Sequence, residues 1–212
     1  MPLKASDRGK SRIEVDPVLR RQLVLAMALD TVAAAAAADG VLQVVVVVDE
    51  PADADQLTRF PGVRVVRTHA SELNKAIVDG ARAMVGDADG RRRSGPVAVL
   101  PGDLPSLLPG ELAAALSAAA LHSRAVVADK QGTGTTLLAA SDVSLLRPRY
   151  GSGSLGRHLA DGAVQLELPV DSGLRRDVDH LADLPDVTGP RTGAVLQRAG
   201  FAREWCASRP AV

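Results

Sequence analysis

The chain alternates between short runs of β-branched residues and longer stretches with helical spacing, and this alternation limits its fold more than any other feature. Val41–Val48 is an apolar run that suits a strand buried on both faces. It follows a helix-length segment, Pro17–Ala38, in which apolar residues recur at helical spacing and Asp16 suits the N-cap. Strands separated by helices of this length predict βαβ crossovers and a mostly parallel sheet.

The same pattern continues along the rest of the chain. We expect strands over 62–67, 96–100, 124–129, 135–139 and 164–168, helices over 72–84, 110–121, 154–162 and 191–205, and a helical turn over 178–184. The polar, glycine-bracketed segment 86–95 predicts a mobile surface loop. No repeat and no linker is visible, so we expect one α/β domain over residues 1–212.

Composition excludes several functional classes. The 212 residues are 46% hydrophobic, enough for a core, and Lys+Arg and Asp+Glu both number 25, without the basic excess of a nucleic-acid binder. Aromatic residues make up 2%, too few for stacking on single strands. The single cysteine, Cys206, excludes an intramolecular disulfide. No apolar run is long enough for a membrane span or a signal peptide, so we expect a cytoplasmic protein.

Acidic residues at strand ends are the first candidates for chemistry, because ligands of open α/β sheets bind at the carboxyl ends of strands. Asp103 closely follows the expected strand 96–100, and Asp177 and Asp179 lie two residues apart beyond a pair of arginines. Carboxylates so placed suit Mg²⁺, which takes one or two of them together with water and substrate phosphates. Aspartates that only form turns or caps, or that the arginines neutralise, are the alternative.

Three further segments could bind anions. Gly132–Thr136 combines two glycines with three hydroxyls, although a tight hairpin would explain it equally well. Tyr150–Ser154 leads into a helix whose first amides could bind phosphate or carboxylate, with His158 on the same face as Ser154; a capping serine and a solvated histidine are the alternative. Lys4–Arg12 carries four basic residues and a glycine, which suits a triphosphate or an untethered N-terminus.

No combination of residues suggests covalent catalysis. The four histidines are scattered, and neither a Ser-His-Asp nor a Cys-His arrangement is apparent. Carboxylates, glycines, hydroxyls and cations instead indicate metal-assisted phosphoryl or nucleotidyl transfer.

Six segments taken together resemble one known family. They are PLKASDRGKSRI, LNKAIVDGA, LPGDLPSL, GTGTTLL, YGSGSLGRH and LRRDVD. In order and spacing, over nearly the whole chain, they resemble the 2-phospho-L-lactate or phosphoenolpyruvate guanylyltransferases of coenzyme F-420 biosynthesis. The resemblance implies a nucleotidyltransferase domain of the glycosyltransferase-A type, with a mixed sheet flanked by helices. It also implies that GMP passes from GTP to a phosphorylated three-carbon acid and that pyrophosphate is released.

The resemblance also implies roles for individual residues. It implies that the catalytic residues, which hold Mg²⁺, are Asp103, Asp177 and Asp179. It implies that the acceptor is bound by Thr136, Gly151 and Ser154, and the nucleotide by Lys4, Lys10, Ser11, Arg12 and Asn74. Glu72 stands where the family often has glycine, two residues before Asn74. Relatives usually have a complete strand before the PLK segment, whereas only Met1 precedes it here, so we expect a truncated first strand.

The acceptor is less constrained than the reaction. The abundance of arginine and alanine suggests a GC-rich, actinobacterial genome, and in that setting the resemblance favours phosphoenolpyruvate. The alternatives are 2-phospho-L-lactate, a molybdopterin-type or sugar-phosphate nucleotidyltransferase, and a non-catalytic nucleotide-binding paralogue. GTP and the three-carbon acid are the expected partners, with neither nucleic acid nor membrane; hand-over of the product to the next enzyme and a homodimer stay open.

Overall fold

The predicted helices and strands follow each other in the expected order, with one short α-helix over Ala54–Leu57 that was not expected. The structure, a computed structural model, describes residues 1–3, 13–49, 54–85 and 95–201. Its strands are β1 (Pro2–Leu3), β2 (Val44–Val48), β3 (Val63–Arg67), β4 (Val97–Val99), β5 (Arg124–Ala128), β6 (Thr135–Ala140) and β7 (Val164–Gln165). Its α-helices are α1 (Pro17–Ala36), α2 (Ala54–Leu57), α3 (Leu73–Val85), α4 (Pro109–Ala119), α5 (Ser154–Ala160) and α6 (Pro190–Arg198). The 3-10 helices are η2 (Val143–Leu145), η3 (Gly173–Arg175) and η4 (Leu181–Asp186).

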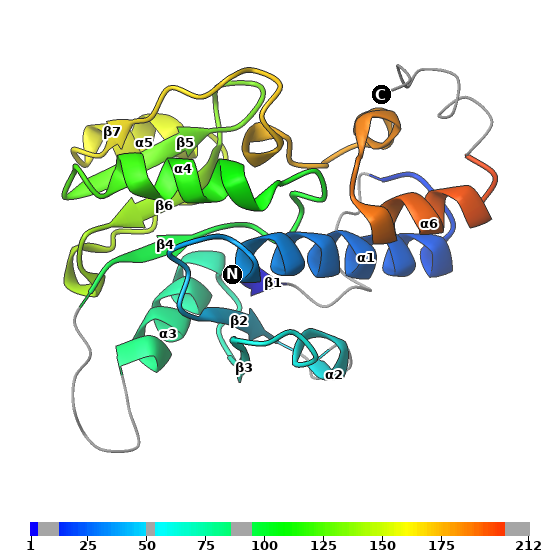
Figure 1. The fold of residues 1–212 in the computed structure, drawn as a ribbon, viewed down its shortest axis with the longest axis horizontal. Helices are drawn as coiled ribbons and strands as arrows, with labels where there is room; N and C mark the ends of the chain where they lie inside the picture. The colour runs from blue at the N-terminus through cyan, green and yellow to red at the C-terminus, as the bar shows by residue number, and fades with distance from the viewer. Residues whose placement is uncertain (4–12, 50–53, 86–94, 202–212) are drawn as a thin grey trace.

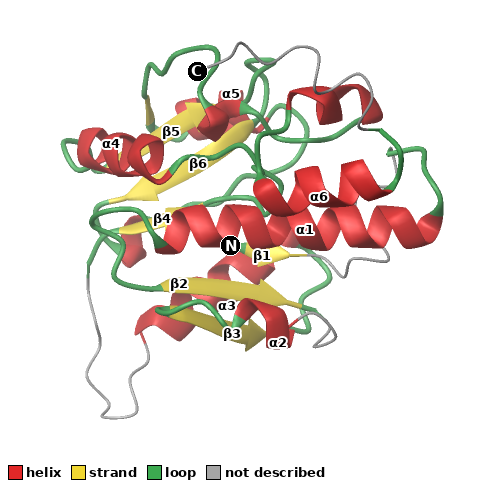
Figure 2. Ribbon diagram, turned by 45° about the vertical axis from the view of Figure 1, so that its right-hand side comes forward, coloured by secondary structure: helices red, strands yellow, loops and turns green. Residues whose placement is uncertain are grey.

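Hydrogen bonding divides the described strands between two sheets. One sheet has the order β1-β2-β3 and is parallel throughout. The other has the order β4-β6-β5-β7, in which β6 runs antiparallel to β4 and β5 while β7 is parallel to β5. In both ribbon views β1 lies between β2 and β4 (Figures 1 and 2). The strands are therefore mostly parallel and mixed, as expected, but β1 and β4 are not joined by a hydrogen-bonded ladder.

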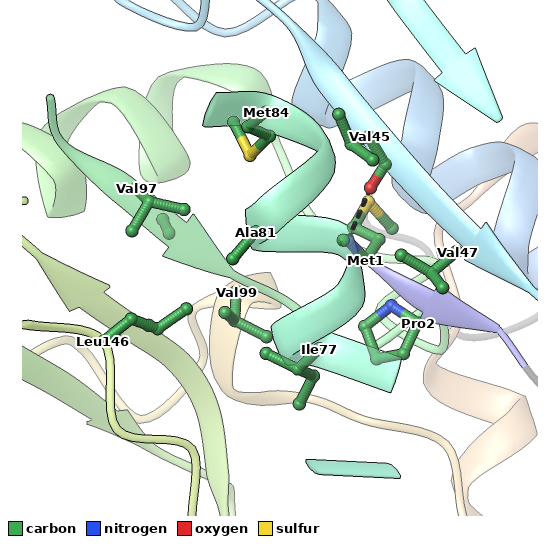
Figure 3. Close-up of a pocket in the computed structure, with 12 residues that line it drawn as sticks. Met1, Pro2, Val45, Val47, Ile77, Ala81, Met84, Val97, Val99 and Leu146 are labelled. Carbon is green, nitrogen blue, oxygen red and sulfur yellow. Dashed lines mark hydrogen bonds between the residues drawn. The ribbon is translucent and has the colours of Figure 1, made fainter. Parts of the chain in front are cut away.

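The two sheets meet where β1 faces the end of β4. A Cβ atom built on Gly102 would overlap the Leu3 side chain, so this glycine permits the close approach. The α-amino group of Met1 donates to the Val45 carbonyl at 2.8 Å, and burial lowers the pKa of this amine to about 5. A pocket between β1–β2 and β4, beneath α3, is lined by apolar side chains such as Ile77, which makes it a packing gap rather than a site for anions (Figure 3).

Helix α1 is the central support of the molecule. Asp16 caps it as predicted, because its Oδ1 accepts from the backbone nitrogens of Val18 at 2.7 Å and Leu19 at 3.1 Å. One face of α1 packs on the strands in the main core, and α6 lies along another part of the helix (Figures 1 and 2). None of the described helices is long and apolar enough to cross a membrane.

Two buried polar residues of α1 anchor distant segments. Asp30 accepts hydrogen bonds from the backbone nitrogens of Arg191 and Thr192 and from the Thr192 hydroxyl, so it caps the first turn of α6. Thr31 donates to the Met27 carbonyl and accepts from the backbone nitrogen of Leu104 at 3.0 Å. Through Thr31, α1 holds the segment that carries Asp103.

Candidate active site

The segment after β4 and the segment after η3 are packed together, and this brings Asp103 beside Asp177. The backbone nitrogen of Val178 donates to the Asp103 carbonyl at 3.0 Å. A Cβ at Gly173 would overlap the Ser106 backbone, so only glycine lets the two segments approach this closely. These contacts join two segments that are about seventy residues apart in the sequence.

Glu111 reinforces this junction from the first turn of α4. Its Oε2 accepts from the backbone nitrogen of Leu108 at 3.0 Å, and its Oε1 accepts from that of Gly173 at 2.9 Å. The Ser106 hydroxyl accepts from the backbone nitrogen of Thr188 at 3.1 Å. The junction is thus fixed by side chains that cap loops, not by apolar packing alone.

The carboxylates of this junction have the chemistry that Mg²⁺ requires. Asp103 and Asp177 are partly buried, and one carboxylate oxygen of each is fully buried. Val178 is buried in the cluster between α1 and α6 and separates Asp177 from Asp179. Within the described residues, no three His, Cys, Asp or Glu side chains are grouped closely enough to hold a metal by themselves. A pair of carboxylates still fits Mg²⁺, because water and substrate phosphates complete its coordination.

The Gly132–Thr136 segment forms a tight hairpin. Both Asp129 carboxylate oxygens are used in the turn, accepting from the backbone nitrogens of Thr133 at 2.9 Å and Gly134 at 2.7 Å. A Cβ at Gly134 would overlap the Asp129 carboxylate. These two amides therefore serve the turn and not an anion, which is the hairpin alternative that the sequence left open.

A β-bulge at the start of β6 decides where its threonines lie. Val127 pairs with Leu137 while Ala128 pairs with Thr135, so Thr136 is the extra residue. The Thr135 hydroxyl consequently reaches α5, 3.2 Å from the Ser154 hydroxyl. The predicted acceptor residue Thr136 is 1% exposed, and its hydroxyl lies 3.5 Å from the Val127 carbonyl.

The predicted acceptor residues Gly151 and Ser154 lie at a turn that the Arg157 side chain holds through hydrogen bonds. Gly151 and Gly153 have φ of 122° and 68°, which favour glycine. Arg157 donates to the carbonyls of Arg149 and Ser152. Gly153 provides the N-cap and Ser154 begins α5, so the capping role expected of the serine falls to its neighbour.

His158 is buried, not solvated as one interpretation of the sequence held. Its Nδ1 lies 3.0 Å from the Thr135 hydroxyl, and its Nε2 accepts from the backbone nitrogen of Arg149 at 2.9 Å. Tyr150 packs against the imidazole edge to face, with ring centres 5.2 Å apart. Burial, and then the nearby Arg157 guanidinium, lower the pKa of His158 to about 4.

Asn74 lies beside the same turn. Its Oδ1 accepts from the backbone nitrogen of Tyr150 at 2.8 Å, and its Nδ2 donates to the Tyr150 carbonyl at 3.2 Å. Helix α3 thus fixes the start of the Tyr150–Ser154 segment. The other predicted nucleotide contacts, Lys4, Lys10, Ser11 and Arg12, lie outside the described residues, as does most of the predicted loop 86–95.

The acidic junction and the acceptor segments lie at the same end of the second sheet, where β4 and β5 end and β6 begins. The carboxyl ends of β4 and β5 lie next to the start of β6, because β6 is antiparallel to both. Arg175 links the two regions by donating to the carbonyls of Asp129 and Leu168. Its neighbour Arg176 forms a 2.7 Å ion pair with Asp186.

Two residues that position this site, and one that anchors α6, were not predicted from the sequence. Asp129, directly before a glycine-rich turn, carries a recognisable signal for a side chain that caps the turn. The sequence does not tell whether the hydroxyl of Thr135 or that of Thr136 faces the site, because a bulge has no reliable sequence signature. Asp30 lies within a long helix and resembles any acidic helix residue, since its partners lie about 160 residues away.

Comparison with known proteins agrees with this architecture. Residues 1–185 match the family model described as "Guanylyl transferase CofC like". The chain is 45% identical over 209 residues to the phosphoenolpyruvate guanylyltransferase of Streptomyces scabiei, covering 93% of this chain and 94% of that protein. It is 42% identical over 204 residues to the protein of the same name from Streptomyces coelicolor, again covering 93% and 94%.

Solved structures share the fold at low sequence identity. A crystal structure described as a nucleotide-diphospho-sugar transferase of Desulfovibrio desulfuricans matches with a TM-score of 0.68 and 12% identity, covering 96% of this chain and 95% of that one. A 4-diphosphocytidyl-2C-methyl-D-erythritol synthase of Anaerococcus prevotii matches with a TM-score of 0.55 and 17% identity, covering 93% and 97%. The nucleotidyltransferase fold is therefore established, and by its sequence the chain belongs to the CofC-like guanylyl transferase family.

Proposed function

We propose that this protein transfers GMP from GTP to phosphoenolpyruvate and releases pyrophosphate, as a step of coenzyme F-420 biosynthesis. The observation that carries the proposal is the junction of Asp103 with Asp177 at the sheet edge that also carries the Tyr150–Ser154 turn. Relatives that align over most of the chain bear the name of this activity. The cytoplasm is the compartment that we propose for it.

The reaction needs no general base from the protein. The second pKa of a phosphate monoester is about 6, so the acceptor phosphate is largely a dianion near neutral pH. One of its oxygens attacks the α-phosphorus of GTP, and a new P–O–P linkage forms. The bond between the α-phosphorus and the oxygen that bridges it to the β-phosphorus breaks, and its electron pair leaves on pyrophosphate. His158 is no candidate base, because both ring nitrogens lie within hydrogen-bond distance of Thr135 or Arg149.

The protein's task is to bring two polyanions together. We propose that Asp103 and Asp177, with Asp179, hold Mg²⁺ together with substrate phosphates. When bound, the cation would offset the phosphate charge and stabilise the in-line transition state. The packed segments of the junction fix the backbone of the two residues that carry these carboxylates, which limits the reorganisation needed during the reaction.

For substrate binding, we propose that the acceptor anion lies at the Tyr150–Ser154 turn. Gly151, Ser154 and Thr136 are its proposed contacts. The GTP phosphates are assigned to Lys4, Lys10, Ser11 and Arg12, with Asn74 as a further nucleotide contact. The product is a reactive diphosphate, which favours hand-over to the next enzyme.

An acceptor-dependent pyrophosphate assay tests the proposal. With Mg²⁺ and GTP, we expect pyrophosphate release with phosphoenolpyruvate, and weaker release with 2-phospho-L-lactate or a sugar phosphate. Asp103→Asn and Asp177→Asn should each lower kcat by about a hundredfold or more, because each removes a charged contribution to transition-state stabilisation. Asp39→Asn, at an exposed position beyond α1, is the matched control.

Three outcomes would contradict these assignments. GTP binding without pyrophosphate release from any acceptor would favour the non-catalytic alternative. A preference for 2-phospho-L-lactate would correct the acceptor alone. Wild-type rates in both aspartate variants would remove the metal assignment.

A further inference from the structure

We propose that His158 is a positioning residue of the acceptor site. It holds the hydroxyls of Thr135 and Ser154 so that one of them donates a hydrogen bond to the anionic acceptor. The inference deepens the proposed function and rests on it. It starts from the buried contacts between α5 and the bulged end of β6.

The contacts of the imidazole fix its tautomer. A backbone N–H can only donate, so the 2.9 Å hydrogen bond from Arg149 requires an unprotonated Nε2. The proton of the neutral ring is then on Nδ1, which faces the Thr135 hydroxyl at 3.0 Å. His158 therefore donates to Thr135. The low pKa of this ring agrees with a neutral imidazole at physiological pH.

The direction of this first hydrogen bond limits the next. Nδ1, the Thr135 oxygen and the Ser154 oxygen form a chain of three atoms, with 3.0 Å and 3.2 Å between neighbours. Together they carry three hydrogens, and the two links use two of them. Whichever hydroxyl donates to the other, one hydroxyl hydrogen is left for a further acceptor. The pair therefore suits a carboxylate or phosphate oxygen.

Buried and packed surroundings enclose this arrangement. His158 is 1% exposed and Ser154 is 2% exposed, so water does not compete freely with the chain of hydrogen bonds. Tyr150 packs on the ring edge, and Arg157 fixes the Arg149 carbonyl. The charged groups around the ring are Arg157, Arg149, Arg124 and Asp161, and three of the four are cationic, which disfavours a protonated imidazole.

Two substitutions of His158 test the contacts of its two ring nitrogens one at a time. His158→Asn keeps an N–H donor near the position of Nδ1, whereas His158→Gln keeps an acceptor near Nε2 and loses the donor to Thr135. We expect His158→Gln to raise the KM for phosphoenolpyruvate about tenfold, because the Thr135 hydroxyl loses the donor that orients it, with a smaller change in the KM for GTP. His158→Asn should restore most of the loss.

A double-mutant cycle tests whether His158 acts through Ser154. In the Ser154→Ala background, adding His158→Gln should cost much less than it costs in the wild type, because the pair of hydroxyls that His158 holds is already broken. Thr135→Val should resemble His158→Gln, and Thr135→Ser should resemble the wild type. Additive losses for His158 and Ser154, or an unchanged acceptor KM in His158→Gln and Thr135→Val, would overturn the inference.

A spectroscopic measurement is independent of activity. Long-range proton–nitrogen NMR correlations of the wild-type protein should show His158 neutral and protonated on Nδ1 at pH 7, and a proton on Nε2 would overturn the inference. If the tautomer is as expected but no three-carbon phosphate yields pyrophosphate, the proposed function fails and the acceptor role of the chain fails with it. Should a variant unfold, Thr135→Ser and Thr135→Val supply the comparison.

Discussion

At the residue scale, Asn74 shows how a residue predicted to contact the nucleotide can have an unexpected neighbour. The family resemblance assigns it to the nucleotide, whereas both ends of its carboxamide hold the backbone of Tyr150. The two hydrogen bonds join α3 to the turn before α5. We therefore predict that Asn74 influences the acceptor first, through the position of the Tyr150–Ser154 turn.

Substitution of Asn74 separates these roles. Asn74→Ala should raise the KM for phosphoenolpyruvate by about thirtyfold, since two backbone hydrogen bonds worth about 1 kcal/mol each are lost. The KM for GTP should change less. Lys75→Ala, at the next and exposed position, is the control for helix α3. A rise confined to the KM for GTP would instead support a direct nucleotide contact.

At the element scale, single polar side chains decide how helices and loops meet. Asp30 of α1 caps α6, and its Oδ1 also lies 3.3 Å from the Arg191 guanidinium. Gly189 is required beside it, because a Cβ there would overlap Asp30 and the Pro105 carbonyl. The start of α6 thus depends on the carboxylate of Asp30, a residue of α1 that is 5% exposed.

Removal of this carboxylate should destabilise the fold without touching the site. Asp30→Ala should lower the free energy of unfolding by about 2–4 kcal/mol, because a helix cap is lost and the buried Thr192 hydroxyl and amide lose their acceptor. Urea denaturation measures the change, and Asp39→Ala, at an exposed position, is the control. A loss below about 0.5 kcal/mol, the range of ordinary surface substitutions, would contradict the capping role.

Most elements could be predicted because their causes are local. The five valines of β2 are all buried, and Asp16 and Pro17 begin α1 at the expected place. The expected helical turn over 178–184 instead lies at η4, Leu181–Asp186, because Asp183 accepts from the backbone nitrogens of Asp179 and His180 and starts the turn later. The strand expected over 164–168 is confined to β7, which pairs with β5 alone.

At the scale of the whole molecule, buried basic groups make stability depend on pH. The pKa of His158 is lowered from 6.5 to about 4, mainly by burial, and that of the Met1 amine from 8.0 to about 5 for the same reason. The unfolded chain therefore binds protons more readily than the folded one, and acid favours unfolding. The contribution of these two groups to the free energy of unfolding should be fully present above about pH 8 and should be lost as the pH is lowered toward 4.

The two groups act in pH windows that overlap only between about pH 6.5 and 5. His158→Asn should flatten the fall in the free energy of unfolding between pH 6.5 and 4, and leave most of the change between pH 8 and 6.5. Chemical denaturation at a series of pH values measures both parts, and His69→Asn is the control because His69 is exposed. An unchanged slope between pH 6.5 and 4 in His158→Asn would show that the imidazole is not held neutral by the fold.

The sequence alone determined the features that depend on neighbouring residues. Helical and strand periodicity, the Asp16 cap and the candidate carboxylates all follow from side-chain chemistry within a few positions. The tertiary structure decided which hydroxyl of Thr135 and Thr136 faces α5, that His158 is buried between Thr135 and Arg149, and that Asp103 lies beside Asp177. These depend on a bulge, on glycines where segments nearly collide, and on polar contacts between distant residues. Sequence periodicity carries no record of such contacts, because they form only when separate segments pack together.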